Sequence, residues 1–133
     1  MTLNLQRADL IRAGHFIAGR WCDGADRHLD VTDPADGSRV GRVPDGGAAD
    51  AAAAADAAQA AFASWRAVPA KERAALLERW HDLVMAHQDD LGRLISREQG
   101  KPLAEARGEV AYAASYIKWF AEQATRSNGE VIP

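Results

Sequence analysis

The chain has 133 residues, of which 47% are hydrophobic and 26% are charged, a composition typical of one soluble globular unit. Its formal net charge of −3 and the lack of a Lys/Arg cluster argue against a nucleic-acid-binding protein, which would show a basic face. No run of about 18 uncharged apolar residues predicts a membrane span, and the single cysteine, Cys22, excludes an intrachain disulfide and fits a reducing cytoplasm.

The first 14 residues are predicted to form an N-terminal arm, either a short helix or a loose segment that frays. The arm lacks the basic-then-apolar order of a signal peptide. Residues 15–133 then form the main unit. Residues 15–22 are expected to fold as a tight hairpin with Ala18 and Gly19 at the turn. Residues 29–33 and 39–44 are predicted as two further strands around a type I turn at residues 34–37.

Four helices are predicted after the strands. The first covers residues 48–67 and is favoured by its alanine content. Pro69 opens the second, Asp89 caps a third that runs to residue 99, and the fourth covers about residues 103–126. Gly100 suits a left-handed cap and makes a sharp corner before the fourth helix. Residues 130–133 are predicted to begin another strand.

Apolar stripes with helical spacing indicate which faces of two of these helices are buried. The second helix is expected to bury Ala74, Leu77, Trp80, Val84 and His87. The fourth is expected to bury Leu103, Ala106, Val110, Ala113, Ile117, Phe120 and Ala124. The sequence therefore predicts an α+β fold that is mainly helical, with about four helices and a small N-terminal antiparallel strand unit.

Residues 98–110 read Glu-Gln-Gly-Lys-Pro-Leu-Ala-Glu-Ala-Arg-Gly-Glu-Val, and residues 112–122 read Tyr-Ala-Ala-Ser-Tyr-Ile-Lys-Trp-Phe-Ala-Glu. Together they closely resemble the NAD(P)-dependent aldehyde dehydrogenases, and most of all the succinate-semialdehyde dehydrogenase branch. The resemblance covers residues 16–133 and only the opening portion of a family member. It implies a fold that lacks the parallel Rossmann-type sheet. Apolar stripes that this sheet would cover are then expected to be exposed, which favours self-association.

The resemblance also implies a function for the complete enzyme. A family member oxidises an aldehyde, here expected to be succinate semialdehyde, to the acid with NAD or NADP, as a cytoplasmic homodimer or homotetramer. The family's nucleophilic cysteine, base, oxyanion-hole asparagine and cofactor-binding lysine all lie beyond residue 133. The chain alone is therefore predicted to be inactive and to bind neither NAD nor NADP, and Cys22 is not expected to be the nucleophile. The alternative is a non-catalytic helical interaction module or a truncated remnant.

Two sets of site residues follow from the resemblance. Glu98, with oxygens from Val31 and Thr32, matches an alkali-cation site, which needs oxygen ligands. The alternative is that Glu98 pairs with Lys101 or Arg97, or is simply solvated.

Gly108 and Tyr112 match positions along the family's substrate entrance tunnel. The alternative is that Tyr112 and Tyr116 only pack against the helix with their hydroxyls in water. The four histidines lack the spacing of a metal site, so no other metal is expected.

Overall fold

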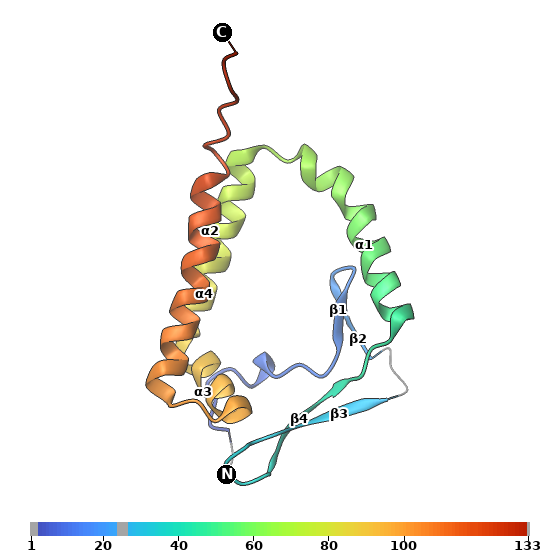
Figure 1. Ribbon diagram of the computed structural model, residues 1–133, viewed down its shortest axis with the longest axis vertical. Helices are drawn as coiled ribbons and strands as arrows, with labels where there is room; N and C mark the ends of the chain where they lie inside the picture. The colour runs from blue at the N-terminus through green and yellow to red at the C-terminus, as the bar shows by residue number, and fades with distance from the viewer. Residues whose placement is uncertain (1–2, 24–26, 133) are drawn as a thin grey trace.

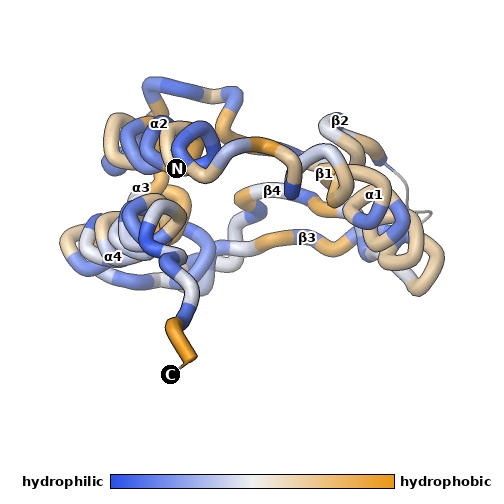
Figure 2. The backbone as a smooth tube through the Cα atoms, turned by 90° about the horizontal axis from the view of Figure 1, so that it is seen from above, coloured by the Kyte–Doolittle hydropathy of each residue, from blue (hydrophilic) through white to orange (hydrophobic). Residues whose placement is uncertain are grey.

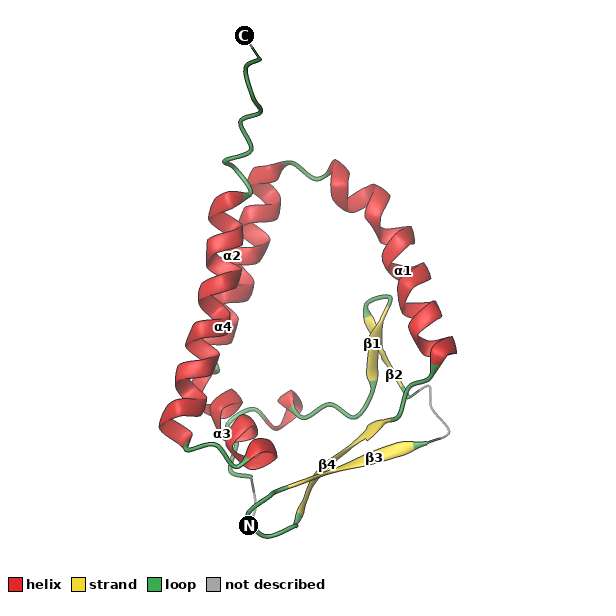
Figure 3. Ribbon diagram, viewed as in Figure 1, coloured by secondary structure: helices red, strands yellow, loops and turns green. Residues whose placement is uncertain are grey.

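The computed structural model describes residues 3–23 and 27–132 of the chain. Helices dominate and two small antiparallel sheets accompany them, which confirms the predicted fold class (Figure 3). In chain order the elements are a 3₁₀ helix η1 (Ala8–Leu10), β1 (His15–Ile17), β2 (Arg20–Cys22), β3 (His28–Thr32), β4 (Arg39–Pro44), α1 (Ala48–Ala67), α2 (Ala70–Ala86), α3 (Gln88–Gln99) and α4 (Leu103–Gln123).

The two sheets are separate β-hairpins. β1 pairs with β2 so that Ile17 lies opposite Arg20, which leaves Ala18 and Gly19 as the predicted two-residue turn. Both turn residues have positive φ, +52° for Ala18 and +77° for Gly19, the conformation that suits the twist of such hairpins. β3 and β4 form the second hairpin, as predicted.

The helices form an open arch. α1 has the predicted bounds and buries none of its residues, so its helical conformation depends largely on the high propensity of alanine. It contacts β1 and lies apart from α2 and α4, while the β3–β4 hairpin crosses the base of the arch (Figure 1). The two limbs of the arch are joined at the top by the short turn around Val68 and Pro69.

α2 and α4 lie side by side, and α3 packs against the start of α4 (Figures 1 and 3). Their contacts are close because the side chains between them are small. At the α3–α4 crossing, a Cβ on Gly92 would lie 3.3 Å from the backbone nitrogen of Arg107. The buried apolar residues are Ala74, Ala106, Val110, Ala114 and Ala121.

The predicted buried stripes are partly wrong. On α4 the bulky Phe120 is 56% exposed and Ala113 is exposed, whereas Ala114 and Ala121 are buried in their place. Trp80 on α2, also predicted inside, is 56% exposed. The physical reason is the close approach of α2 and α4, which admits alanine and excludes aromatic rings. The aromatic side chains therefore lie on the outer faces of the helices.

The predicted start of α3 is also wrong. α3 begins at Gln88 with His87 in the cap position, and neither this cap nor Asp89 supplies a side-chain cap. Instead the Asp89 carboxylate accepts hydrogen bonds from Arg93 and Arg107, which ties α3 to α4. The Arg93 bond, then the Arg107 bond, lower the pKa of Asp89 below its ordinary value.

The C-terminal segment differs from the prediction as well. α4 ends at Gln123, three residues before the predicted end, and Gly129 further on has a positive φ of +70°. Residues 127–132 have no regular structure, so the predicted strand from residue 130 is wrong over its described part, and residue 133 lies outside the described residues. An extended segment needs a partner strand, and this tail projects away from both hairpins (Figure 1). Its apolar tip is visible in Figure 2.

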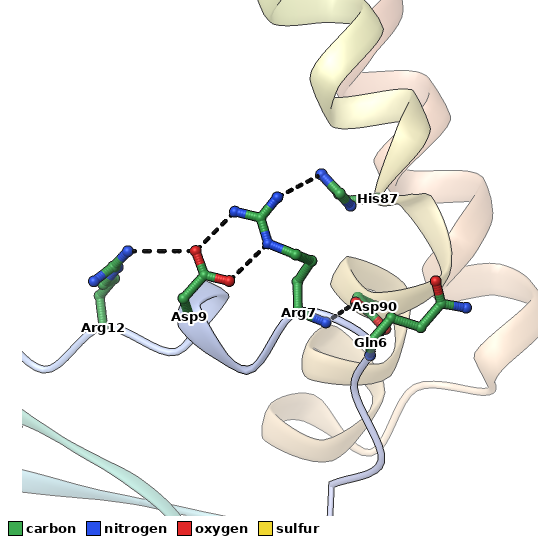
Figure 4. A network of polar contacts seen from close by, with 6 residues as sticks. All are labelled: Gln6, Arg7, Asp9, Arg12, His87 and Asp90. Carbon is green, nitrogen blue, oxygen red and sulfur yellow. Dashed lines mark hydrogen bonds and ion pairs between the residues drawn. The ribbon is translucent and has the colours of Figure 1, made fainter.

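The described part of the N-terminal arm, residues 3–14, is docked, although a loose segment was one of its two predicted forms, and residues 1–2 lie outside the described residues. The buried carboxylate of Asp90 accepts the backbone N–H of Gln6 at 3.0 Å and of Arg7 at 2.9 Å (Figure 4). The Arg7 guanidinium reaches His87 at 3.3 Å and pairs with Asp9. The Arg7 hydrogen bond lowers the pKa of Asp9 to about 2. η1 confirms the short-helix form of the prediction.

Many large apolar side chains remain exposed, as expected for helices without a covering sheet. They include Phe62 and Trp65 on α1, Leu76, Trp80 and Leu83 on α2, and Tyr112, Tyr116, Trp119 and Phe120 on α4. The predicted self-association stays a prediction. Within the described residues, the structure contains no helix long and apolar enough to cross a membrane.

Candidate functional site

A buried ion pair fixes the second hairpin against α3. Asp33 is only 4% exposed, and its Oδ2 lies 2.6 Å from Nη1 of Arg97. Its Oδ1 accepts the backbone N–H of Ala35 at 2.8 Å, and Nη2 of Arg97 donates to Oγ of Ser38 at 3.2 Å. One guanidinium thus holds both ends of the β3–β4 loop, which sets the position of the strand just before it.

The corner between α3 and α4 completes this attachment. Gly100 has the predicted left-handed conformation, with φ of +73°, and its N–H donates to the carbonyl of Ser96 at 2.8 Å. A Cβ at this position would lie 2.9 Å from Cγ of Pro34. The loop and the corner are therefore in direct contact, and only glycine fits both the backbone angle and the space.

Val31 and Glu98 come together in one groove. The groove has a volume of about 500 Å³ and lies between the arm, the second hairpin and α3, with Leu94 and Trp21 among its lining residues. Thr32 does not line it. The β3–β4 register shifts between Val31 and Thr32, and such an irregularity leaves backbone groups out of the ladder. The structure thus groups two of the three predicted cation-site residues and leaves the third outside the lining.

The predicted alternative partners of Glu98 are taken by other residues. Lys101 pairs with Glu109, and Arg97 pairs with Asp33. Within the described residues Glu98 forms an ion pair with neither of them, so that alternative is wrong, while the other alternative, a solvated Glu98, fits its exposed carboxylate at the edge of the groove. In residues 3–23 and 27–132, no cluster of three or more His, Cys, Asp or Glu side chains could hold a metal ion.

The second candidate site is the outer face of α4. Gly108 and Tyr112 are both exposed and lie one helical turn apart. The hydroxyl of Tyr112 is 2.6 Å from that of Tyr116, and the two rings meet edge to face with centroids 5.0 Å apart. Ser115 donates to the carbonyl of Tyr112 and so bonds to its own helix. The two tyrosines form a hydrogen-bonded pair, with Tyr112 64% and Tyr116 50% exposed.

We expect this pair to be visible in a tyrosine titration. The hydrogen bond with Tyr112 raises the pKa of Tyr116 above its ordinary value. Because the chain has only two tyrosines, absorbance at phenolate wavelengths can resolve them. In the Tyr112→Phe variant the remaining tyrosine should ionise at lower pH than the more basic tyrosine of the parent. An unchanged upper ionisation would show that the hydroxyls do not bond in solution.

Cys22 lies on β2, half-buried, where its thiol donates to the carbonyl of Arg20 at 3.6 Å. Within the described residues no hydrogen bond joins its sulfur to a histidine or a carboxylate, although His15 lies opposite Cys22 in the hairpin.

Comparisons with known proteins identify the family of the chain. The family model described as "Aldehyde dehydrogenase family" matches residues 21–133. The chain belongs to the aldehyde dehydrogenase family. It is 51% identical over 132 residues to the NADP(+)-type succinate-semialdehyde dehydrogenase of Escherichia coli (strain K12). The aligned region covers 98% of this chain and 27% of that enzyme. It is 50% identical over 132 residues to glutarate-semialdehyde dehydrogenase of Pseudomonas putida, covering 98% and 28%.

A solved structure confirms the fold. The succinate-semialdehyde dehydrogenase of Burkholderia pseudomallei superimposes with a TM-score of 0.93 at 52% sequence identity, covering 98% of this chain and 27% of that one. The chain thus spans about a quarter of the length of the relatives that it matches. The predicted resemblance to this branch, and to the opening part of the fold, is confirmed.

Sequence reasoning missed the contacts of Asp33, Arg97 and Asp90, the charged residues that hold the arm and the second hairpin in place. The turn at residues 33–37 was visible in the sequence, but its arginine partner is about 60 residues away and leaves no local signal.

Proposed function

We propose that this chain is the N-terminal scaffold of a semialdehyde dehydrogenase. The complete enzyme would oxidise succinate semialdehyde, or an aldehyde of similar ω-carboxylate chemistry, to the acid with NAD or NADP, as a homodimer or homotetramer in the cytoplasm. The observation that carries the proposal is identity of about half over nearly the whole chain to enzymes named for succinate and glutarate semialdehyde.

Within this proposal the chain itself carries no chemistry. Its only thiol donates to a backbone carbonyl, and the polar groups of the fold serve attachment: Asp33 holds Arg97, Asp90 holds the arm, and Asp89 holds α4. The chain alone would therefore be inactive and bind neither NAD nor NADP.

The candidate sites enter as support for the scaffold. Glu98 and oxygens of Val31 and Thr32 would hold an alkali cation, since a lone free carboxylate with backbone oxygens fits a monovalent ion. The cation would neutralise the Glu98 carboxylate and link the end of α3 to β3. Gly108 and Tyr112 would border the path of the aldehyde, with Tyr116 holding the Tyr112 hydroxyl.

A chimera tests the scaffold. This chain would replace the matched segment of the Escherichia coli enzyme, and NADPH formation from succinate semialdehyde would be followed by absorbance. We expect the chimera to be active, the Escherichia coli enzyme without its own segment to be inactive, and the 133-residue chain to give no turnover.

Two outcomes would contradict the proposal. A chimera that folds and assembles but does not turn over would refute the scaffold role, and turnover by the isolated chain would refute its inactivity. The alternative, a non-catalytic interaction module, predicts that the isolated chain binds tightly to an intact dehydrogenase.

A further inference from the structure

The tail after α4 contains a chemically labile pair of residues. Asn128 is followed by Gly129, and both are exposed in a segment without regular structure. The tail leaves the α2–α4 pair and projects from it (Figure 1), with Val131 92% and Ile132 86% exposed. Among the described residues neither member of the pair forms a hydrogen bond, so little opposes local backbone motion here.

The reaction available to such a pair is intramolecular. The backbone nitrogen of Gly129 attacks Cγ of the Asn128 side chain, a C–N bond forms, and the side-chain nitrogen leaves as ammonia with the proton of the Gly129 N–H. Water then adds to either carbonyl of the five-membered succinimide and opens it. The net change is one water consumed and one ammonia released, with no oxidation or reduction.

Glycine at position 129 favours the attack for two reasons. Without a Cβ, its nitrogen can approach the side chain closely and its φ is unrestricted, as the observed +70° shows. Within the described part of the chain, the structure also gives the Gly129 N–H no hydrogen-bond partner. We propose that Asn128 is a site of spontaneous deamidation in this protein, independently of the function proposed above.

Two other sites in the same chain show what the fold can prevent. At Asp36–Gly37 the N–H of Gly37 donates to the carbonyl of Asp33 at 2.8 Å, and the Asp36 carboxylate accepts from Ser38. The Gly37 nitrogen and the Asp36 carboxyl group, the two groups that would react in the same ring closure, are therefore both held by hydrogen bonds. The remaining asparagine, Asn4, precedes Leu5, whose side chain hinders the approach of its nitrogen.

Deamidation would change the tail in two ways. It would add one negative charge two residues before Glu130, to a chain whose formal net charge is already −3. The isoaspartyl product would also insert a methylene into the backbone just before Val131 and Ile132. Both changes alter the direction and the charge of an apolar tip that has no partner within the described residues.

Mass spectrometry tests the proposal directly. Trypsin cleaves after Arg126 and Arg7, so residues 127–133 and 1–7 are released as peptides with one asparagine each. The purified chain would be incubated at mildly alkaline pH and sampled over time. A gain of about one dalton, with two products that elute separately, is expected in the 127–133 peptide and not in the 1–7 peptide, because only Asn128 precedes a glycine.

Two controls make the outcome decisive. A synthetic peptide of residues 127–133 gives the rate without a fold, and the chain should match it within about threefold because its tail is free. The Gly129→Ala variant should slow the reaction on the order of tenfold, and Asn128→Gln should abolish it. A chain rate more than threefold below the peptide rate, or equal modification of Asn4, would overturn the proposal.

Discussion

Replacing Asp33 with alanine is expected to lower the free energy of unfolding by about 3 kcal/mol, because it leaves the Arg97 guanidinium buried without its partner. Arg97 is 21% exposed at its side chain, which keeps the loss at the lower end of the range for buried pairs. The substitution also removes the hydrogen bond to the Ala35 N–H. Urea unfolding followed by circular dichroism measures the loss, and amide exchange should rise in the β3–β4 loop first.

Asp36 provides the matched control. It lies three residues further along the same loop and accepts a backbone hydrogen bond from Ser38, but it is exposed and makes no ion pair within the described residues. Asp36→Ala should therefore change the unfolding midpoint little. The double variant Asp33→Ala with Arg97→Ala should be less damaging than the two single losses added together. Equal effects at Asp33 and Asp36 would contradict a buried ion pair.

The sequence was sufficient for most of the elements, but not for the start of α3, the end of α4 or the tail, and it was poor for the packing of the helices. Alanine content favours α1, Pro69 opens α2, and Gly100 must end α3 because its φ is positive. These are local effects of backbone preference. The buried face of α4, in contrast, depends on packing against another helix. Phe120 fits the apolar spacing, but Ala121 fits the space left by α2.

The candidate site shows the same division. Family motifs gave Glu98 and Tyr112 as candidates, and a turn motif predicted the loop that starts at Asp33. The contacts that position them join segments far apart in the chain, as with Asp33 and Arg97, so no spacing rule could reveal them. The predicted strand in the tail is wrong for a related reason. A strand pattern at residues 130–132 predicts a strand only if a partner is present.

Asp90→Ala is expected to release the N-terminal arm. The carboxylate is 3% exposed and accepts the N–H groups of Gln6 and Arg7, both charge-assisted hydrogen bonds. Losing them should cost about 2–3 kcal/mol and leave two backbone donors to water. Proteolysis of the arm should report the loss more clearly than the free energy of unfolding does, because trypsin should cleave after Arg7 much faster than in the parent chain. Limited proteolysis with N-terminal sequencing measures this directly.

The Asp9→Ala variant distinguishes two contacts that could hold the arm: the exposed ion pair with Arg7 and the backbone hydrogen bonds to Asp90. Asp9 pairs with the guanidinium of Arg7 on the exposed side of the arm, whereas Asp90 holds the backbone from the buried side (Figure 4). If the backbone bonds hold the arm, Asp9→Ala should leave cleavage after Arg7 nearly unchanged, and Asp90→Asn, which keeps one acceptor oxygen, should fall between parent and alanine. If Asp9→Ala releases the arm as fully as Asp90→Ala, the surface pair holds it and the buried carboxylate does not.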